Sequence, residues 1–207
     1  MIIILLTTTV NTQNHISWLK QKNANEREKM YINIINLWLS KTNFKIVVVE
    51  NSGHNMNIKN ERLELISFTY PKKDKNILDK MEAKGQHEMY SISYACKNST
   101  FINNCNYVIK ITGRYFIPSL ENILNKNLND KINFIRQSTI WRNMNRCEIV
   151  GCSKNNIDKL FYFPLKNDMM EQEMMDRMKI SKDILNLPKM KLHKKTRQGV
   201  GSLIKIL

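Results

Sequence analysis

The sequence predicts an α/β fold, a single domain over residues 1–207 with a mixed, mainly parallel sheet flanked by helices. Three apolar runs of strand length, residues 2–6, 44–49 and 107–111, are typical of strands that are covered on both faces. Segments with helical spacing separate these runs, an order that favours parallel strands joined by crossovers. Only 6 Gly and 4 Pro argue against an all-β or loop-dominated chain.

Polar side chains follow the first strand at its carboxyl end, where ligands bind in open α/β sheets. Thr7, Thr8 and Thr9 come directly after residues 2–6. Their hydroxyl groups could contact a base or a ribose, or they could cap the next helix. Helical spacing then extends from residue 15 to 39, and polar residues 23–29 within it suggest an exposed turn or a helix end.

The second strand also ends in polar groups, because Glu50 and Asn51 follow residues 44–49. A third strand is predicted from 62 to 68, where apolar and polar residues alternate, and a basic loop follows from 70 to 80. Lys84 and Gly85 stand before a helix expected from about 88 to 96. A cation and a glycine at a helix N-terminus favour a bound anion. The alternative is a solvated lysine and a loop glycine.

Residues 105–118 combine a buried strand with the groups of an anion site. The strand ends in Thr112-Gly113-Arg114, where glycine lets the backbone turn sharply or approach a ligand closely. Lys110 and Arg114 flank this glycine. The segment therefore predicts either an anion-binding rim or an ordinary turn with two surface cations.

The second half of the chain predicts further helices and strands. A carboxylate cluster lies in its methionine-rich helix: Asp168, Glu171 and Glu173. These side chains could interact with the helix dipole or supply a catalytic carboxylate. The expected elements are helices at 118–128, 155–161 and 167–180, strands at 132–136 and 148–151, and a short apolar segment at 138–141.

The C-terminal tail is basic and contains glycine. Lys194, Lys195 and Arg197 precede Gly199 and Gly201. Backbone N–H groups of such a loop can wrap a phosphate, although an ordinary basic tail has the same composition. Neither a GxxxxGK[ST] nor a GxGxxG motif occurs in the sequence, so it predicts neither a P-loop nor a Rossmann site.

The chain is strongly basic, with 33 Lys and Arg against 18 Asp and Glu and a formal net charge of +15. Such a chain attracts nucleic acids, nucleotide phosphates or anionic membranes. The charges are spread along the sequence, without an Arg-rich block or a basic motif interleaved with aromatic residues.

Cysteine usage and hydropathy indicate the compartment. The four cysteines form no CxxC pair, and their apolar neighbours favour buried free thiols in a reducing environment. No stretch reaches the length of a membrane span, and residues 1–6 are too short for a signal-peptide core. We therefore expect a cytoplasmic protein without a membrane span.

The ordered motifs resemble a small GT-A-type glycosyltransferase, similar to those of bacterial surface-polysaccharide pathways and large DNA viruses. The resemblance is carried, in chain order, by MIIILLTTT, IVVVENSG, KGQHEM, NYVIKITGRYFIP, WRNMNRCEIVG, MMEQEM and KTRQGVG. It implies a nucleotide-diphospho-sugar transferase fold, with a nucleotide-binding half over about residues 1–117 and an acceptor and catalytic half over about 118–207. It also implies a nucleotide-sugar donor, a glycan or other hydroxyl acceptor and, for a viral member, the host cytoplasm.

The resemblance assigns roles to residues of this chain. It implies Glu171 as the catalytic base and Lys84 and Gly85 as the residues that pack over the diphosphate. The nucleotide sugar would be bound by Thr7, Thr8, Thr9, Glu50, Asn51, Lys84, Gly85, Lys110, Thr112, Gly113, Arg114, Arg197 and Gly199.

The sequence departs from the family in one respect. GT-A enzymes usually carry an Asp-x-Asp that holds Mn²⁺ or Mg²⁺ beneath the diphosphate, whereas this chain has Lys110-Ile111-Thr112 at about that place and no Asp-x-Asp. Lys110 and Arg114 could neutralise the leaving diphosphate directly. This predicts transfer without a metal, and Mn²⁺ or Mg²⁺ remains the alternative. The alternative function is a non-catalytic, basic nucleic-acid-binding protein.

Overall fold

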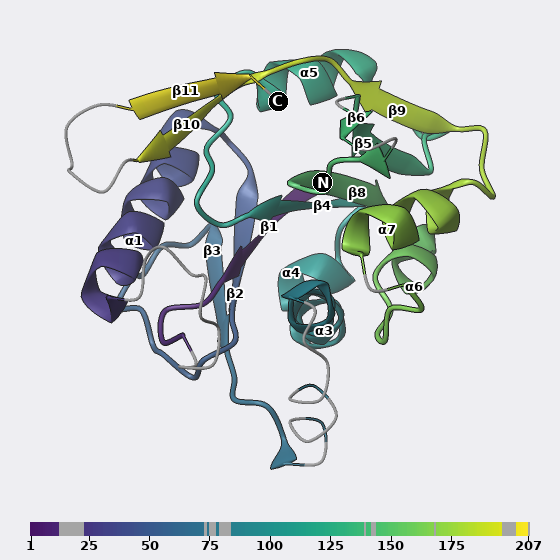
Figure 1. Ribbon diagram of the computed structural model, residues 1–207. Helices are drawn as coiled ribbons and strands as arrows, with labels where there is room; N and C mark the ends of the chain where they lie inside the picture. Colours follow the sequence, from purple (N-terminus) through teal and green to yellow (C-terminus); the bar gives the residue numbers. More distant parts are fainter. Residues whose placement is uncertain are drawn as a thin grey trace.

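A seven-stranded sheet forms the centre of the protein (Figure 1). The structure, a computed structural model, describes residues 1–12, 23–72, 74, 78, 84–138, 140–141, 144–167, 169–195 and 202–206. The strand order is β3-β2-β1-β4-β8-β5-β9. The strands are β1 Ile2–Thr8, β2 Lys45–Glu50, β3 Leu63–Ser67, β4 Tyr107–Thr112, β5 Phe134–Gln137, β8 Ile149–Ser153 and β9 Ile184–Leu187.

The sheet is mixed and mainly parallel, which confirms the predicted fold class. Strands β3, β2, β1 and β4 run in one direction, as do β5 and β9 relative to each other. Only β8 is antiparallel to its neighbours, β4 and β5. The carboxyl ends of the four parallel strands therefore lie at one edge of the sheet.

Helices cover both faces because side chains of the central strands alternate between two apolar cores. Ile4 and Leu6 of β1 face the core built with α1 (Ala24–Lys41), α5 (Leu120–Asn127) and the start of β10. Ile3 and Leu5 face the opposite core. That core contains residues of α3 (Lys84–Asn98), α4 (Thr100–Asn103), α6 (Ile157–Leu160) and α7 (Met170–Met178).

Helix α1 begins at Ala24, and the Asn23 side chain caps it by accepting a hydrogen bond from the Glu26 N–H at 3.2 Å. Of the two alternatives for residues 23–29, an exposed turn or a helix end, the structure shows the helix end, because residues 24–29 form the first turns of α1. The N-terminal part of that predicted helix, residues 15–22, lies outside the described residues.

Helix α3 differs from its prediction. Its described part begins at Lys84, so Lys84 and Gly85 lie within the helix rather than before it.

The C-terminal region contains strands where a basic loop was expected. Lys194 and Lys195 lie in β10 (Lys191–Lys195), which pairs antiparallel with β11 (Ser202–Ile206). Arg197, Gly199 and Gly201 lie outside the described residues. The remaining short elements are β6 Ile140–Trp141, β7 Met144–Asn145 and a 3-10 turn at Lys154–Asn156.

Two expectations about the chain as a whole can be compared with the structure. All four cysteines are buried thiols that form no disulfide, as predicted. Within the described residues, no helix combines the length and the apolar character needed to span a bilayer.

Candidate functional site

The carboxyl ends of β1, β2 and β4 bring predicted residues from three segments together. The strand register pairs Thr7 with Thr112 and Thr8 with Glu50. The N–H of Gly113 donates to the Thr7 carbonyl at 3.0 Å, and a Cβ on this glycine would lie 2.5 Å from the same oxygen. The close approach that requires glycine here is thus to β1 itself.

Glu50 organises the loops that follow β1 and β2. Its carboxylate is 1% exposed and accepts hydrogen bonds from the backbone N–H groups of Val10, Ser52 and His54 at 2.9, 3.0 and 2.8 Å. The side chain therefore shapes the edge of the site, and its predicted contact with a nucleoside stays a prediction. Thr8 is also buried, and its hydroxyl donates to the Val49 carbonyl at 3.1 Å.

Asn51 connects the first two strand ends to α3. Its Oδ1 accepts from the Thr9 hydroxyl at 2.7 Å, and its Nδ2 donates to Tyr70 Oη at 2.9 Å and to Ser91 Oγ at 3.0 Å. Burial raises the pKa of Tyr70 to about 12, so this hydroxyl keeps its proton at neutral pH. Tyr70 and Ser91 were not predicted, since nothing local in the sequence links them to Asn51.

Arg27 of α1 holds the chain just after β1. Its Nε donates to the Thr9 carbonyl at 2.6 Å, and its Nη2 donates to Tyr31 Oη at 2.9 Å. The side chain is only 9% exposed. Arg27 and Tyr31 were missed because the sequence of their segment predicts an exposed turn or a helix end and then a helix, with no indication of which helix face meets the sheet edge.

Lys110 lies beneath the edge, against α3. Its Nζ is 2.7 Å from Glu88 Oε1 and donates to the Cys147 carbonyl at 2.8 Å, with Thr112 Oγ1 at 3.5 Å. The Thr7 hydroxyl donates to the same Glu88 oxygen at 2.8 Å. Lys110 is 1% exposed. Its predicted direct contact with a diphosphate stays a prediction.

The ion pair fixes the protonation of Glu88. Burial raises the pKa of this carboxyl group, but the charge of Lys110 and the hydrogen bonds from Lys110 and Thr7 outweigh that effect. The pKa of Glu88 therefore lies below its usual value, and the group is ionised at neutral pH. Sequence reasoning missed Glu88, although it stands in the KGQHEM segment, because only the cation and the glycine there were considered.

Arg114 is a cation of this edge that faces solvent. Its guanidinium lies 5.5 Å from the centre of the Tyr115 ring, and the side chain is exposed. Arg114 makes no hydrogen bond or ion pair with any residue that the structure describes. It remains within electrostatic range of Glu88, whose pKa it helps to lower.

Glu171 lies near the same end of β4. Burial raises the pKa of the Cys147 thiol; Lys110 lowers it, whereas the charges of Glu171, Glu88 and Glu148 raise it further. Glu171 is half-buried in the first turn of α7. The charges of carboxylates from three segments thus act on the Cys147 thiol. The role of Glu171 as a base stays a prediction.

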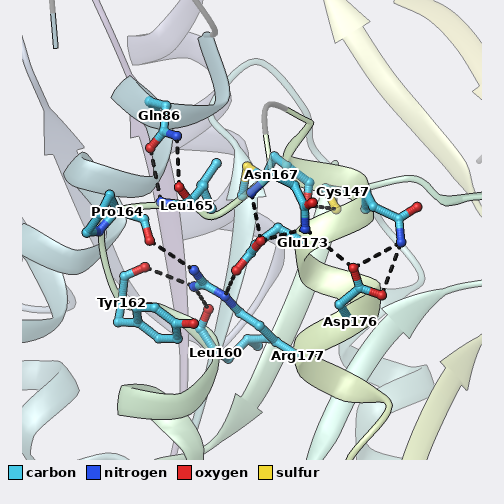
Figure 2. A network of polar contacts seen from close by, with 12 residues as sticks. Gln86, Cys147, Leu160, Tyr162, Pro164, Leu165, Asn167, Glu173, Asp176 and Arg177 are labelled. Carbon is cyan, nitrogen blue, oxygen red and sulfur yellow. Dashed lines mark hydrogen bonds and ion pairs between the residues drawn. The ribbon is translucent and has the colours of Figure 1, made fainter. Parts of the chain in front are cut away.

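A buried network holds α7 and the loop before it (Figure 2). Glu173 is 2% exposed, pairs with Arg177 Nε at 2.8 Å, and accepts from the Asn167 backbone and side chain at 3.0 and 2.7 Å. Arg177 Nη1 also donates to the carbonyls of Leu160 and Tyr162 at 2.8 and 2.9 Å. Glu173 is therefore a structural residue, while Asp168 lies outside the described residues.

Gly85 serves the packing of α3 on α7. A Cβ at this position would lie 3.1 Å from Met170 Cβ and 3.3 Å from Leu165 Cδ1. Beside it, the Gln86 amide exchanges two hydrogen bonds of 3.1 and 3.0 Å with the Leu165 backbone, as Figure 2 shows. The predicted diphosphate contacts of Lys84 and Gly85 stay predictions.

The residues at the place of the family's Asp-x-Asp do not fit a divalent cation. The Lys110 ammonium already takes the oxygens of Glu88 and Cys147 there, and it would repel a metal ion. Among the residues that the structure describes, no three His, Cys, Asp or Glu side chains are grouped as metal ligands.

The strand order and direction define a nucleotide-diphospho-sugar transferase fold of the GT-A type. A protein from Desulfovibrio desulfuricans G20, described as a nucleotide-diphospho-sugar transferase, aligns with a TM-score of 0.52 and 10% identity over 90% of this chain and 79% of that chain. An active-site mutant of LgtC aligns with a TM-score of 0.55 and 8% identity, over 89% and 72% of the two chains. The galactosyltransferase LgtC in complex with donor and acceptor sugar analogues aligns with a TM-score of 0.50 and 8% identity, over the same shares of the two chains.

At these identities the likeness establishes the fold alone. No protein-family model matches the sequence, and no curated protein sequence matches it.

Proposed function

We propose that this protein is a glycosyltransferase that moves a sugar from a nucleotide-sugar donor to a glycan or other hydroxyl acceptor. The observation that carries the proposal is the meeting of Thr7, Thr9, Asn51 and Thr112 at the carboxyl edge of a GT-A-like sheet, with the exposed Arg114 beside them. Ligands of open α/β sheets bind at such an edge. The resemblance to proteins of polysaccharide pathways and large DNA viruses favours a glycan acceptor.

The proposed reaction is a displacement at the anomeric carbon of the donor sugar. The acceptor oxygen bonds to this carbon, the bond to the diphosphate oxygen breaks, and the electron pair leaves with the nucleoside diphosphate. Glu171 takes the acceptor proton as general base. Arg114 donates to the departing diphosphate, because its planar guanidinium carries fixed donors that suit phosphate oxygens.

The remaining roles follow from position at the edge for Thr9 and Asn51, and from the resemblance for Arg197 and Gly199. Thr9 and Asn51 would contact the nucleoside. Arg197 and Gly199, which precede β11 in the chain, would contribute to the diphosphate site. No step in this scheme requires a bound metal ion.

A thermal-shift screen with UDP-, GDP-, TDP- and CMP-sugars, each with and without Mn²⁺, tests the proposal. A ligand at 100 times its Kd stabilises a protein by about 2.7 kcal/mol. For a domain of this size that is a rise in Tm of about 5–10 °C. We expect such a rise with one class of nucleotide sugar, unchanged by EDTA.

The net charge of +15 favours nucleic-acid binding as the second candidate function. Titration of DNA and RNA against salt separates the two functions. Tight binding with a steep negative salt slope, together with no shift by any nucleotide sugar, would contradict the glycosyltransferase proposal.

A further inference from the structure

We infer that Glu88 is the residue that accepts a hydrogen bond from a hydroxyl group of the donor sugar, and that Lys110 is the positioning residue that holds it. The inference rests on the proposed function and assigns the sugar-binding part of that site. It is carried by the geometry of the two residues beneath the carboxyl edge of β1 and β4.

The two oxygens of Glu88 have different surroundings. Both the Thr7 hydroxyl, at 2.8 Å, and the Lys110 ammonium, at 2.7 Å, contact Oε1. Oε2 has no hydrogen-bond partner among the described residues, and the side chain is 30% exposed. One oxygen thus anchors the carboxylate, and the other is available to a ligand.

Lys110 acts through Glu88 rather than on the ligand. It is 1% exposed, and its three N–H groups are directed to Glu88 Oε1, to the Cys147 carbonyl and, more weakly, to Thr112 Oγ1. In the structure the ammonium is therefore directed at protein oxygens. Its contribution is to keep Glu88 ionised and in one orientation.

The chemistry of Oε2 selects a neutral hydroxyl donor. An ionised carboxylate only accepts hydrogen bonds, so it repels the phosphates of the donor. A divalent cation at Oε2 would be repelled by the Lys110 ammonium, which contacts the same carboxylate. Arg114, the proposed diphosphate ligand, is within electrostatic range of Glu88. In the inferred arrangement, a sugar attached to a diphosphate at Arg114 presents a hydroxyl group to Oε2.

Calorimetric titration of Glu88→Gln tests the inference. The probes are matched pairs, UDP with UDP-glucose, UDP-galactose or UDP-N-acetylglucosamine, and GDP with GDP-mannose. We expect the Kd of the nucleoside diphosphate to stay within about twofold of wild type. The Kd of the sugar nucleotide should rise about 10-fold or more, because a hydrogen bond to a charged group is lost. Glu121→Gln, the same change on α5 at the opposite face, is the matched control and should alter neither value.

Lys110→Met tests the positioning role. Because Lys110 is buried, the fold of this variant is first checked by circular dichroism, and Thr7→Val serves as a milder second variant. Both variants should weaken binding of the sugar nucleotide more than binding of the nucleoside diphosphate. General destabilisation of the fold would not change the ratio of these two Kd values.

The outcomes separate the inference from the function on which it rests. A wild-type protein that binds no member of the panel and no other nucleotide sugar of the thermal-shift screen overturns both. If the wild-type protein binds a pair and Glu88→Gln weakens binding of both members equally, or of neither, only the role of Glu88 is overturned.

Discussion

Arg114 is the residue at which the proposed charge stabilisation can be tested with least disturbance of the fold, because its side chain is exposed. Charge-assisted hydrogen bonds of the proposed kind contribute about 1.5–3 kcal/mol. Arg114→Ala should therefore lower kcat/KM by about 10- to 100-fold, with an unchanged Tm. Steady-state kinetics with the donor found in the screen measure this. Lys126→Ala, an exposed cation on α5, is the control, and near-normal turnover of Arg114→Ala would remove Arg114 from the site.

Glu171 is the proposed base, and Glu171→Gln keeps nearly the same shape. We expect donor affinity to be retained and transfer to fall by about 10²–10⁴-fold, since the amide cannot accept the acceptor proton. Glu148→Gln changes a carboxylate in the same neighbourhood and should have a much smaller effect. If Glu148→Gln abolishes transfer while Glu171→Gln remains active, the base has been assigned to the wrong residue.

The residues at the strand ends could be predicted from the sequence, but their partners could not. Thr7, Asn51 and Gly113 were found because apolar runs locate the ends of buried strands, and parallel ends meet at one edge. Glu88 hydrogen-bonds to Thr7 from 81 positions away, which no local pattern reports. For Lys110 the sequence predicted the position of the cation at the edge, but not its burial, since that depends on how α3 packs on the sheet.

At the scale of elements, α7 depends on the buried pair of Glu173 and Arg177. Removing one member of a buried ion pair leaves an uncompensated charge, which costs about 3–5 kcal/mol. Arg177→Met should therefore lower the free energy of unfolding by that amount in urea denaturation. Changing both residues to Met should recover part of the loss. A single change without measurable destabilisation would show that the network does not hold the loop.

The same pair predicts an acid dependence of stability. Burial raises the pKa of Glu173, but Arg177 and Asn167 outweigh this, so the folded-state pKa lies below its ordinary value of 4.5. The contribution is therefore present above that value and is lost as pH falls through the folded-state pKa. The stability difference between wild type and the double Met variant, measured by urea denaturation across this pH range, should shrink at acidic pH.

Sequence patterns predicted the central elements better than the peripheral ones. Strands β1 and β2 contain continuous apolar runs, and β4 contains one that only Lys110 interrupts. Such runs have few alternatives to burial. Strand β8 was predicted, but its reversed direction was not, because strand direction depends on the connections and not on the strand's own residues. Strand β9 was missed because its apolar run is short, with Asn186 interrupting it, and only Leu187 of its four residues is buried.

At the scale of the whole molecule, the charge of +15 favours rapid capture of an anionic donor but does not locate its site. Location is supplied by the sheet, which brings polar side chains to one edge while both faces are covered by helices (Figure 1). The proposed function therefore depends on where a nucleotide sugar binds, not only on whether it binds.

Amide hydrogen exchange, measured with and without the nucleotide sugar that raises Tm, tests this most directly. The proposed function predicts that the ligand slows exchange in the segments after β1, β2 and β4, at residues 7–12, 50–54 and 112–115. It also predicts little change in α5, which packs in the core on the α1 side of the sheet. Protection confined to other basic segments, with none at the three strand ends, would contradict a nucleotide-sugar site at this edge.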